Sequence, residues 1–249
     1  MAELGLRQSH CGEATAGALE GAMLPWLSAL DLAENTGMGP YLSRVLAPMP
    51  QLRRLCAFDC GLTDAAAEAL GREALPRLTT LEVLDLCEAV HVTPRGWAAL
   101  ARGLSPGTRA SLRVLLLEDC PGLDGASVAA LLGGGERGAA PLSDHSLAAR
   151  VTRRGWAALP RGWSPGPRAL LRALQLRSCR GPDAASAGAL LGGREGGGAA
   201  LSALRVLRLD CRNEQNTSEA MEAALRGAWL PSLRVLYLDR VPLRVELVD

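Results

Sequence analysis

The sequence contains no lysine and no isoleucine, so all 27 of its basic residues are arginine. Without lysine the chain cannot carry a phosphate-binding GKS or GKT loop, a kinase-type lysine or a Schiff base with pyridoxal phosphate. Aromatic residues make up only 3% of the chain. These absences exclude several classes of enzyme and predict a core built mainly from leucine, alanine and valine.

The rest of the composition is typical of a folded domain. The chain has 249 residues, of which 48% are hydrophobic and 21% charged, and its net charge is +1. These values argue against intrinsic disorder and against nucleic-acid binding. Glu3, Arg7 and Glu13 interrupt the N-terminal segment, and no run of about 20 uncharged apolar residues follows, so we expect neither a secretory leader nor a membrane span. A cytoplasmic location is therefore predicted.

Repeats dominate the sequence. The segment that starts at Val92 recurs from Val151, an offset of 59 residues (151 minus 92). A shorter motif, LxxLxL followed two residues later by Asn or Cys, starts at Leu27, Leu52, Leu81, Leu112, Leu171, Leu204 and Leu233. Such spacing indicates an array of stacked structural units.

Between these motifs the apolar spacing becomes helical. Thr93 and Pro94 form a helix start, after which Trp97, Leu100 and Leu104 fall on one face. The segment from Ser105 to Gly107 is predicted to end this helix. One strand–turn–helix unit cannot bury its own apolar face, whereas stacked units can.

The recurring motif resembles that of the leucine-rich-repeat family, in particular its ribonuclease-inhibitor-like subtype. The resemblance implies an α/β solenoid shaped as a curved horseshoe, with a parallel β-sheet on the concave face, helices on the convex face and about eight repeats. A single domain over residues 1–249 is expected. The family's turn residue, Asn or Cys, is matched by Asn35, Cys60, Cys120 and Cys179. Less regular turns are predicted where the chain departs from it, at Ala89, Arg212 and Val241.

One repeat lacks its signature. The 59-residue offset predicts its strand near residues 140–145, where Ala, Ser and His replace the three leucines and Pro141 interrupts the pattern. Proline disfavours a central strand. We therefore predict a degenerate repeat at about residues 137–165.

The candidate binding residues are the variable positions of the strands. Because side chains alternate across a strand, the third, fifth and seventh motif positions, with the eighth beside them, are expected on the concave face. On the first four motif strands these positions carry seven carboxylates and one arginine. Phe58, Leu116 and Tyr237 are predicted as exposed anchors. The full set is Asp31, Glu34, Arg54, Phe58, Asp59, Asp85, Glu88, Leu116, Glu118, Asp119, Arg177, Arg208 and Tyr237.

No catalytic or metal-binding group stands out. The three histidines, His10, His91 and His145, are scattered, and the cysteines follow the repeat, so buried, reduced thiols are expected and neither a metal nor a cofactor is predicted. The sequence favours a non-enzymatic module that binds a protein with a basic surface, and neither nucleic acid nor a membrane. Four alternatives remain open: an acidic face that only keeps the protein in solution, a GTPase-activating regulator resembling Ran GTPase-activating proteins, a substrate-recognition subunit of a ubiquitin ligase, and a degenerate copy without function.

Overall fold

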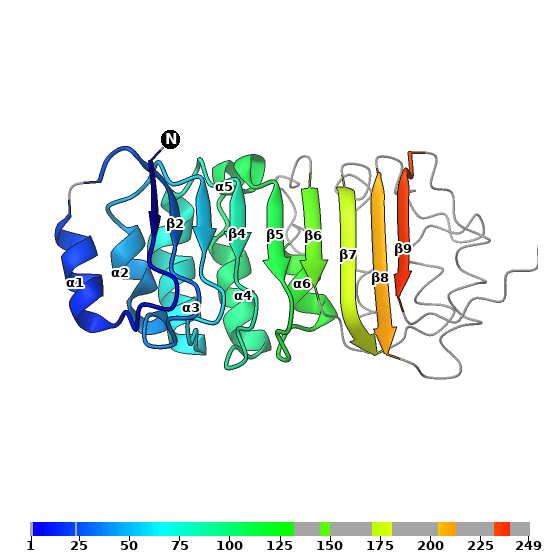
Figure 1. The fold of residues 1–249 in the computed structure, drawn as a ribbon, viewed down its shortest axis with the longest axis horizontal. Helices are drawn as coiled ribbons and strands as arrows, with labels where there is room; N and C mark the ends of the chain where they lie inside the picture. The colour runs from blue at the N-terminus through cyan, green and yellow to red at the C-terminus, as the bar shows by residue number, and fades with distance from the viewer. Residues whose placement is uncertain are drawn as a thin grey trace, which may run out of the picture.

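The fold is one parallel sheet with helices packed on one of its faces (Figure 1). A computed structural model describes residues 2–22, 24–131, 145–149, 171–180, 204–212 and 232–239. The described strands are neighbours in chain order from β1 to β9, and every pair is parallel. They are β1 (Ala2–Gly5), β2 (Leu27–Asp31), β3 (Arg54–Cys56), β4 (Val83–Asp85), β5 (Val114–Leu117), β6 (His145–Ala149), β7 (Leu171–Arg180), β8 (Val206–Arg212) and β9 (Val235–Asp239).

Helical segments return the chain from one strand to the next. The described ones are α1 (Glu13–Gly21), η1 (Gly39–Tyr41), α2 (Leu42–Leu46), α3 (Asp64–Ala69), the π-helical turn η2 (Leu70–Ala74), η3 (Leu75–Arg77), α4 (Pro94–Gly103), α5 (Pro106–Ser111) and α6 (Gly125–Leu131). In Figure 1 α1 and α2 lie to the left of β1, and α3, α4 and α6 lie behind the strands. Within these described segments, no helix has the length and apolar character needed to cross a bilayer.

The core is a row of stacked leucines. The fourth motif position of every described strand pairs with the same position of its neighbour, as in Leu30 with Leu55 and Leu84 with Leu115. Leu30, Leu55, Leu84 and Leu115 are all buried, and they share one cluster with residues of the helices. At the two ends of the described sheet the same position is less covered, since Leu4 in β1 is half-buried and Leu236 in β9 is 44% exposed. The prediction that the motif leucines point inward is thus confirmed for β2 to β5.

The helix predicted after Thr93 is confirmed, but its end differs from expectation. The Thr93 side chain accepts a hydrogen bond from the backbone N–H of Arg95, and Trp97 is completely buried, as its place on the apolar face predicted. Ser105 does more than follow the end of α4. Its hydroxyl accepts a hydrogen bond from the Thr108 N–H and caps a second helix, α5. A Ser-Pro pair can follow the end of one helix and also begin the next one. The spacing of apolar residues did not distinguish these two roles.

Two strands differ from the predicted pattern. β1 was not expected, because Met1 stands at the first leucine position of the motif. Leu4 and Leu6 occupy the other two leucine positions. The strand of the degenerate repeat is β6, at His145–Ala149 instead of residues 140–145. It pairs with β5 and β7 through Leu147, so the leucine in register with Leu115 and Leu174 lies after Pro141 in the sequence. The other residues of the predicted degenerate repeat lie outside the described ones.

The turns after the strands are closed by buried polar side chains. The Asn35 amide is 1% exposed; its oxygen accepts from the Cys11 N–H at 2.9 Å, and its nitrogen donates to the carbonyls of Leu6 and Leu32 at 2.8 Å. The Cys60 thiol donates to the Leu32 carbonyl at 3.1 Å. These contacts confirm the turn role of Asn35 and Cys60.

The expectation of a less regular turn at Ala89 is wrong. Glu88, directly before it, has a φ of 56°, close to the 59° of Glu34 before Asn35, and its N–H donates to the next repeat. Buried Ala89 therefore keeps the same backbone without a polar side chain, because neighbouring repeats impose the turn. Arg212 ends the described β8, and Val241 lies outside the described residues.

A buried arginine ties two helix ends together. Arg109 is 6% exposed, and its guanidinium donates to the carbonyls of Leu104 and Ala101 at 2.9 and 2.7 Å. It also donates to the Leu131 carbonyl at 2.6 Å. One cation thus donates to carbonyls at the C-terminal ends of both α4 and α6.

Close backbone contact joins η2 to α4. A Cβ atom built on Gly103 would lie 2.1 Å from the Gly71 carbonyl oxygen, and one on Gly71 would lie 2.5 Å from the Ala99 oxygen. Only glycine permits this approach, because the opposing atoms belong to backbone and cannot rotate away.

We expect Gly103→Ala to lower the free energy of unfolding by about 1–3 kcal/mol, because the added methyl group separates the two helices. Gly17→Ala is the matched control. Gly17 lies on the exposed side of α1 with no atom within 4 Å of a built Cβ. It should stabilise the protein by about 0.5–1 kcal/mol through helix propensity. Urea denaturation measures both, and equal stability of the two variants would contradict the close contact.

Candidate interaction surface

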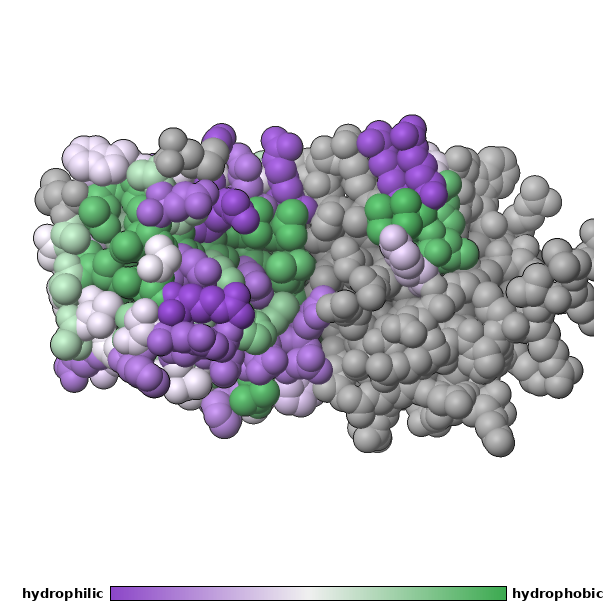
Figure 2. Space-filling model, viewed as in Figure 1, coloured by the Kyte–Doolittle hydropathy of each residue, from purple (hydrophilic) through white to green (hydrophobic). Residues whose placement is uncertain are grey.

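The candidate site is the face of the sheet turned away from the helices, which we call the sheet face. Figure 2 shows this face, with hydrophilic side chains gathered over the middle of the N-terminal strands and hydrophobic ones on either side. Strand alternation places the third, fifth and seventh motif positions here, with the eighth at the strand ends. The register joins equal positions of neighbouring strands, so the predicted residues form rows across the sheet.

The fifth-position row combines structural and surface roles. Asp31 pairs with Cys56 and Cys56 with Asp85 in adjacent strands. A carboxylate oxygen of Asp31 accepts from the Ala33 N–H at 2.9 Å, and one of Asp85 accepts from the Cys87 N–H at 3.0 Å. Both carboxylates are half-buried. They therefore satisfy backbone donors at the strand ends while adding negative charge to the face.

The eighth-position row is the most unusual feature of the face, and we call Glu34, Asp59, Glu88 and Asp119 the acidic ladder. Their φ angles lie between 48° and 59°, a left-handed conformation that is uncommon for residues other than glycine. The N–H groups of Glu34, Asp59 and Glu88 each donate to the seventh-position carbonyl of the next repeat, at 2.8, 3.1 and 2.8 Å. The same turn in consecutive repeats thus stacks four carboxylates along one edge.

The acidic ladder behaves as one electrostatic unit. Partial burial raises the pKa of Glu88 from its usual value, and the nearby charges of Asp59, Asp119 and Glu34 raise it further. Like charges that are held this close repel each other and disfavour ionisation. The predicted concentration of negative charge is therefore present in the fold.

Glu34, at one end of the ladder, is contacted by Arg7 and Gln8, which were not among the predicted residues. The Gln8 and Arg7 side chains both hydrogen-bond Glu34 and lower the pKa of its carboxyl. The Arg7 Nε lies 2.8 Å from Glu34 Oε1, and its guanidinium lies 6.0 Å from the centre of the Phe58 ring. Arg7 was missed because β1 was missed, and the remaining leucines of the motif, Leu4 and Leu6, were the available signal.

The other predicted residues are distributed unevenly. Arg54 is exposed and lies 4.0 Å from the Glu3 carboxylate. Phe58 and Leu116 are half-buried, so the prediction that they are exposed anchors is wrong for both. Glu118, also half-buried, occupies the seventh position beside Asp119.

The C-terminal members of the predicted set lie apart from the ladder. Tyr237 in β9 is 57% exposed, which confirms it as an accessible aromatic residue. Its backbone pairs with Arg208 in β8, while Arg177 belongs to β7. The side chains of both arginines lie outside the described ones. Four strand spacings, about 19 Å, separate β5 from β9, so the ladder and Tyr237 would not contact one small ligand together.

The cysteines of the described N-terminal part are free thiols. Burial raises the pKa of Cys56, Cys60 and Cys120 to about 12, and it also raises that of Cys87. Such thiols are poor nucleophiles and poor metal ligands, because both roles need the thiolate. Over the described ranges, no group of three or more His, Cys, Asp or Glu residues is placed to hold a metal ion.

Comparisons with known proteins support the fold. No protein-family model matches the chain, and no curated protein sequence matches it. A chain of the yeast Rad7–Elc1 complex superposes with a TM-score of 0.52 at 19% identity, over 86% of this chain and 50% of its own length. With one LxxLxL strand per repeat stacked in chain order, this likeness decides the architecture. The protein has the leucine-rich-repeat fold.

Two other solved leucine-rich-repeat structures show weaker similarity. The internalin inlF from Listeria monocytogenes has a TM-score of 0.41 at 14% identity, over 87% of this chain and 56% of its own. LegL7 from Legionella pneumophila has a TM-score of 0.40 at 16% identity, over 98% of this chain and 84% of its own. This leucine-rich-repeat chain thus spans about half the length of the first two chains it resembles.

The opposite pKa shifts of Glu88 and Glu34 predict opposite effects of removing their charges. Glu88→Gln should raise the free energy of unfolding at pH 7 by roughly 0.2–1 kcal/mol, because a neutral side chain is easier to bury and the repulsion by the neighbouring carboxylates is relieved. Glu34→Gln should lower it, because the contacts with Arg7 and Gln8 are weakened. A raised pKa means that ionised Glu88 destabilises the fold near neutrality, and this penalty disappears at acidic pH.

The stabilising contribution of Glu34 is present above its unfolded pKa and is lost as the pH falls through its lowered folded value. Denaturation at about pH 7 and about pH 3.5, on either side of the usual glutamate pKa, measures both variants. A loss of stability in Glu88→Gln at pH 7 would contradict the destabilising role of that charge, and a gain in Glu34→Gln would contradict the stabilising contacts of Glu34.

Proposed function

We propose that this leucine-rich-repeat protein is a non-enzymatic interaction module whose sheet face binds a partner protein with a basic surface. The acidic ladder carries this proposal, because four consecutive repeats present carboxylates at the same position. A row of like charges costs stability through repulsion, and a cationic partner would offset that cost while gaining electrostatic steering.

The protein itself shows how a cation can bind this face. Arg7 places its guanidinium against the Glu34 carboxylate and over the Phe58 ring. Arginine combines a forked set of donors with a planar, weakly hydrated surface, and both properties are used in this contact. We infer that an arginine of the partner makes a similar contact with Glu88 and Asp59.

Partner binding also agrees with the structural comparison. The similar yeast chain was solved in a complex of two proteins, Rad7 and Elc1. A stacked-repeat architecture offers an extended surface in which each repeat adds one row of side chains. This supports a macromolecular partner over a small substrate.

Affinity capture with a charge-neutralised bait tests the proposal. The variant Asp59→Asn, Glu88→Gln, Asp119→Asn removes three ladder charges, and Asn is well tolerated at the two left-handed positions that it takes over. Proteins captured from source-cell lysate by the native chain should be reduced about tenfold or more on this variant. Their release should also increase with salt concentration, because exposed charge pairs are screened.

The matched control is Glu13→Gln, Glu20→Gln, Glu82→Gln, which removes the same charge away from the ladder. It should retain the partners of the native chain, and circular dichroism should show that all three baits fold. Equal capture by native protein, ladder variant and control would refute binding through the acidic ladder.

A further inference from the structure

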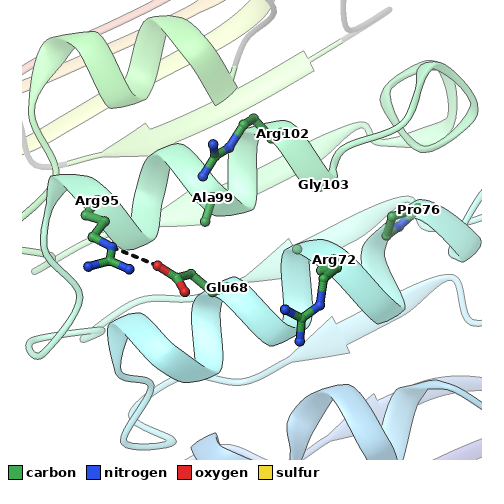
Figure 3. A pocket seen from close by; sticks show the side chains of 8 residues that line it. Glu68, Arg72, Pro76, Arg95, Ala99, Arg102 and Gly103 are labelled. Carbon is green, nitrogen blue, oxygen red and sulfur yellow. Dashed lines mark hydrogen bonds and ion pairs between the residues drawn. The ribbon is translucent and has the colours of Figure 1, made fainter.

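A second surface lies on the helix side, opposite the sheet face. A groove of about 550 Å³ opens between α3–η2 and α4. Figure 3 shows its lining side chains, which come from both helical segments. They are Glu68, Gly71, Arg72, Pro76, Arg95, Ala99, Arg102 and Gly103.

The floor of this groove is made of backbone and small side chains. Gly71, Ala99 and Gly103 lie where the two helical segments touch, as the blocked Cβ positions show. The long side chains stand at the rim (Figure 3). The groove therefore has a floor without bulky side chains and charged side chains along its rim.

Those walls carry more positive than negative charge. Arg72, Arg95 and Arg102 line the groove together with one carboxylate, Glu68. The Arg95 Nε lies 2.8 Å from Glu68 Oε1. Arg72 has its own ion pair, with Glu73 at 2.7 Å, outside the groove lining.

Arg102 is the available cation of the groove. Among the described residues it makes no hydrogen bond or ion pair, and its side chain is exposed. A basic residue at this place usually complements the C-terminal carbonyls of its helix. In α4 the buried Arg109 already does so, through the carbonyls of Ala101 and Leu104. The charge of Arg102 is therefore not needed to complete the helix end.

We propose that this groove binds a phosphate group carried on a peptide side chain. Guanidinium groups recognise phosphate through paired, charge-assisted hydrogen bonds, which suits a site whose only cations are arginines. Arg102 supplies the first contact, and Arg72 turns from Glu73 to supply the second. The groove has the size of an ordinary ligand pocket and exceeds what one phosphate ion fills. The surplus volume favours phosphate displayed on an organic group.

Fluorescence polarisation with labelled Gly-Gly-pSer-Gly-Gly and its unphosphorylated form tests this site. The native protein should bind the phosphorylated peptide saturably and at least about tenfold more tightly than the plain one. Arg72→Gln, Arg102→Gln should weaken that binding at least about tenfold. The control Arg113→Gln, Arg205→Gln removes two exposed arginines at strand starts and should change it less than about twofold.

Competition with inorganic phosphate separates the two sources of the anion. Displacement only at concentrations far above that of the peptide supports the displayed group, whereas displacement at similar concentrations assigns the site to free phosphate and overturns the peptide part of the proposal. Absence of saturable binding, or equal binding by the native protein and Arg72→Gln, Arg102→Gln, overturns the site itself. The acidic-ladder variant should keep phosphopeptide binding, so this result does not depend on the proposed function of the sheet face.

Discussion

The stacking of one inward leucine per strand is the constraint on which the rest of this structure depends. A strand as short as Val83–Asp85 buries nothing by itself, and each leucine is enclosed only when the repeats on both sides are in place. Burying one such side chain stabilises the fold by about 1.5–3 kcal/mol. Parallel pairing with equal positions opposed follows, because any slip by one residue would turn the leucines toward solvent.

That register also brings like charges together. Since equal motif positions face each other, an acidic residue that recurs at the eighth position must stand beside its copies, as Glu88 does between Asp59 and Asp119. Asp31 and Asp85 offset part of their cost by accepting backbone hydrogen bonds. Within the described part of the chain the Glu88 side chain has no such backbone contact, and its pKa is raised first by partial burial and then by the neighbouring carboxylates. A partner with a basic surface would be electrostatically complementary to this row of carboxylates.

Arginine performs three different tasks in this lysine-free chain. Arg7 binds a carboxylate at the sheet face, Arg109 satisfies buried helix carbonyls, and Arg102 stands at the rim of the helix-side groove. The first two rely on a planar cation with several donors. The acidic ladder and the groove therefore carry charges of opposite sign, which separates the proposed basic partner from the proposed phosphopeptide.

The sequence by itself determined the repeat, the parallel sheet, the burial of Trp97 and the position of the acidic ladder, because each follows from short-range periodicity. It did not reveal β1, whose first leucine is replaced by Met1, or the true place of β6. Tertiary structure decided the contact of Arg7 with Glu34, the partial burial of Phe58, the helix-end contacts of Arg109 and the groove beside Arg102. These depend on how one repeat lies on the next, and residues about one repeat apart in sequence meet only after the leucines have stacked.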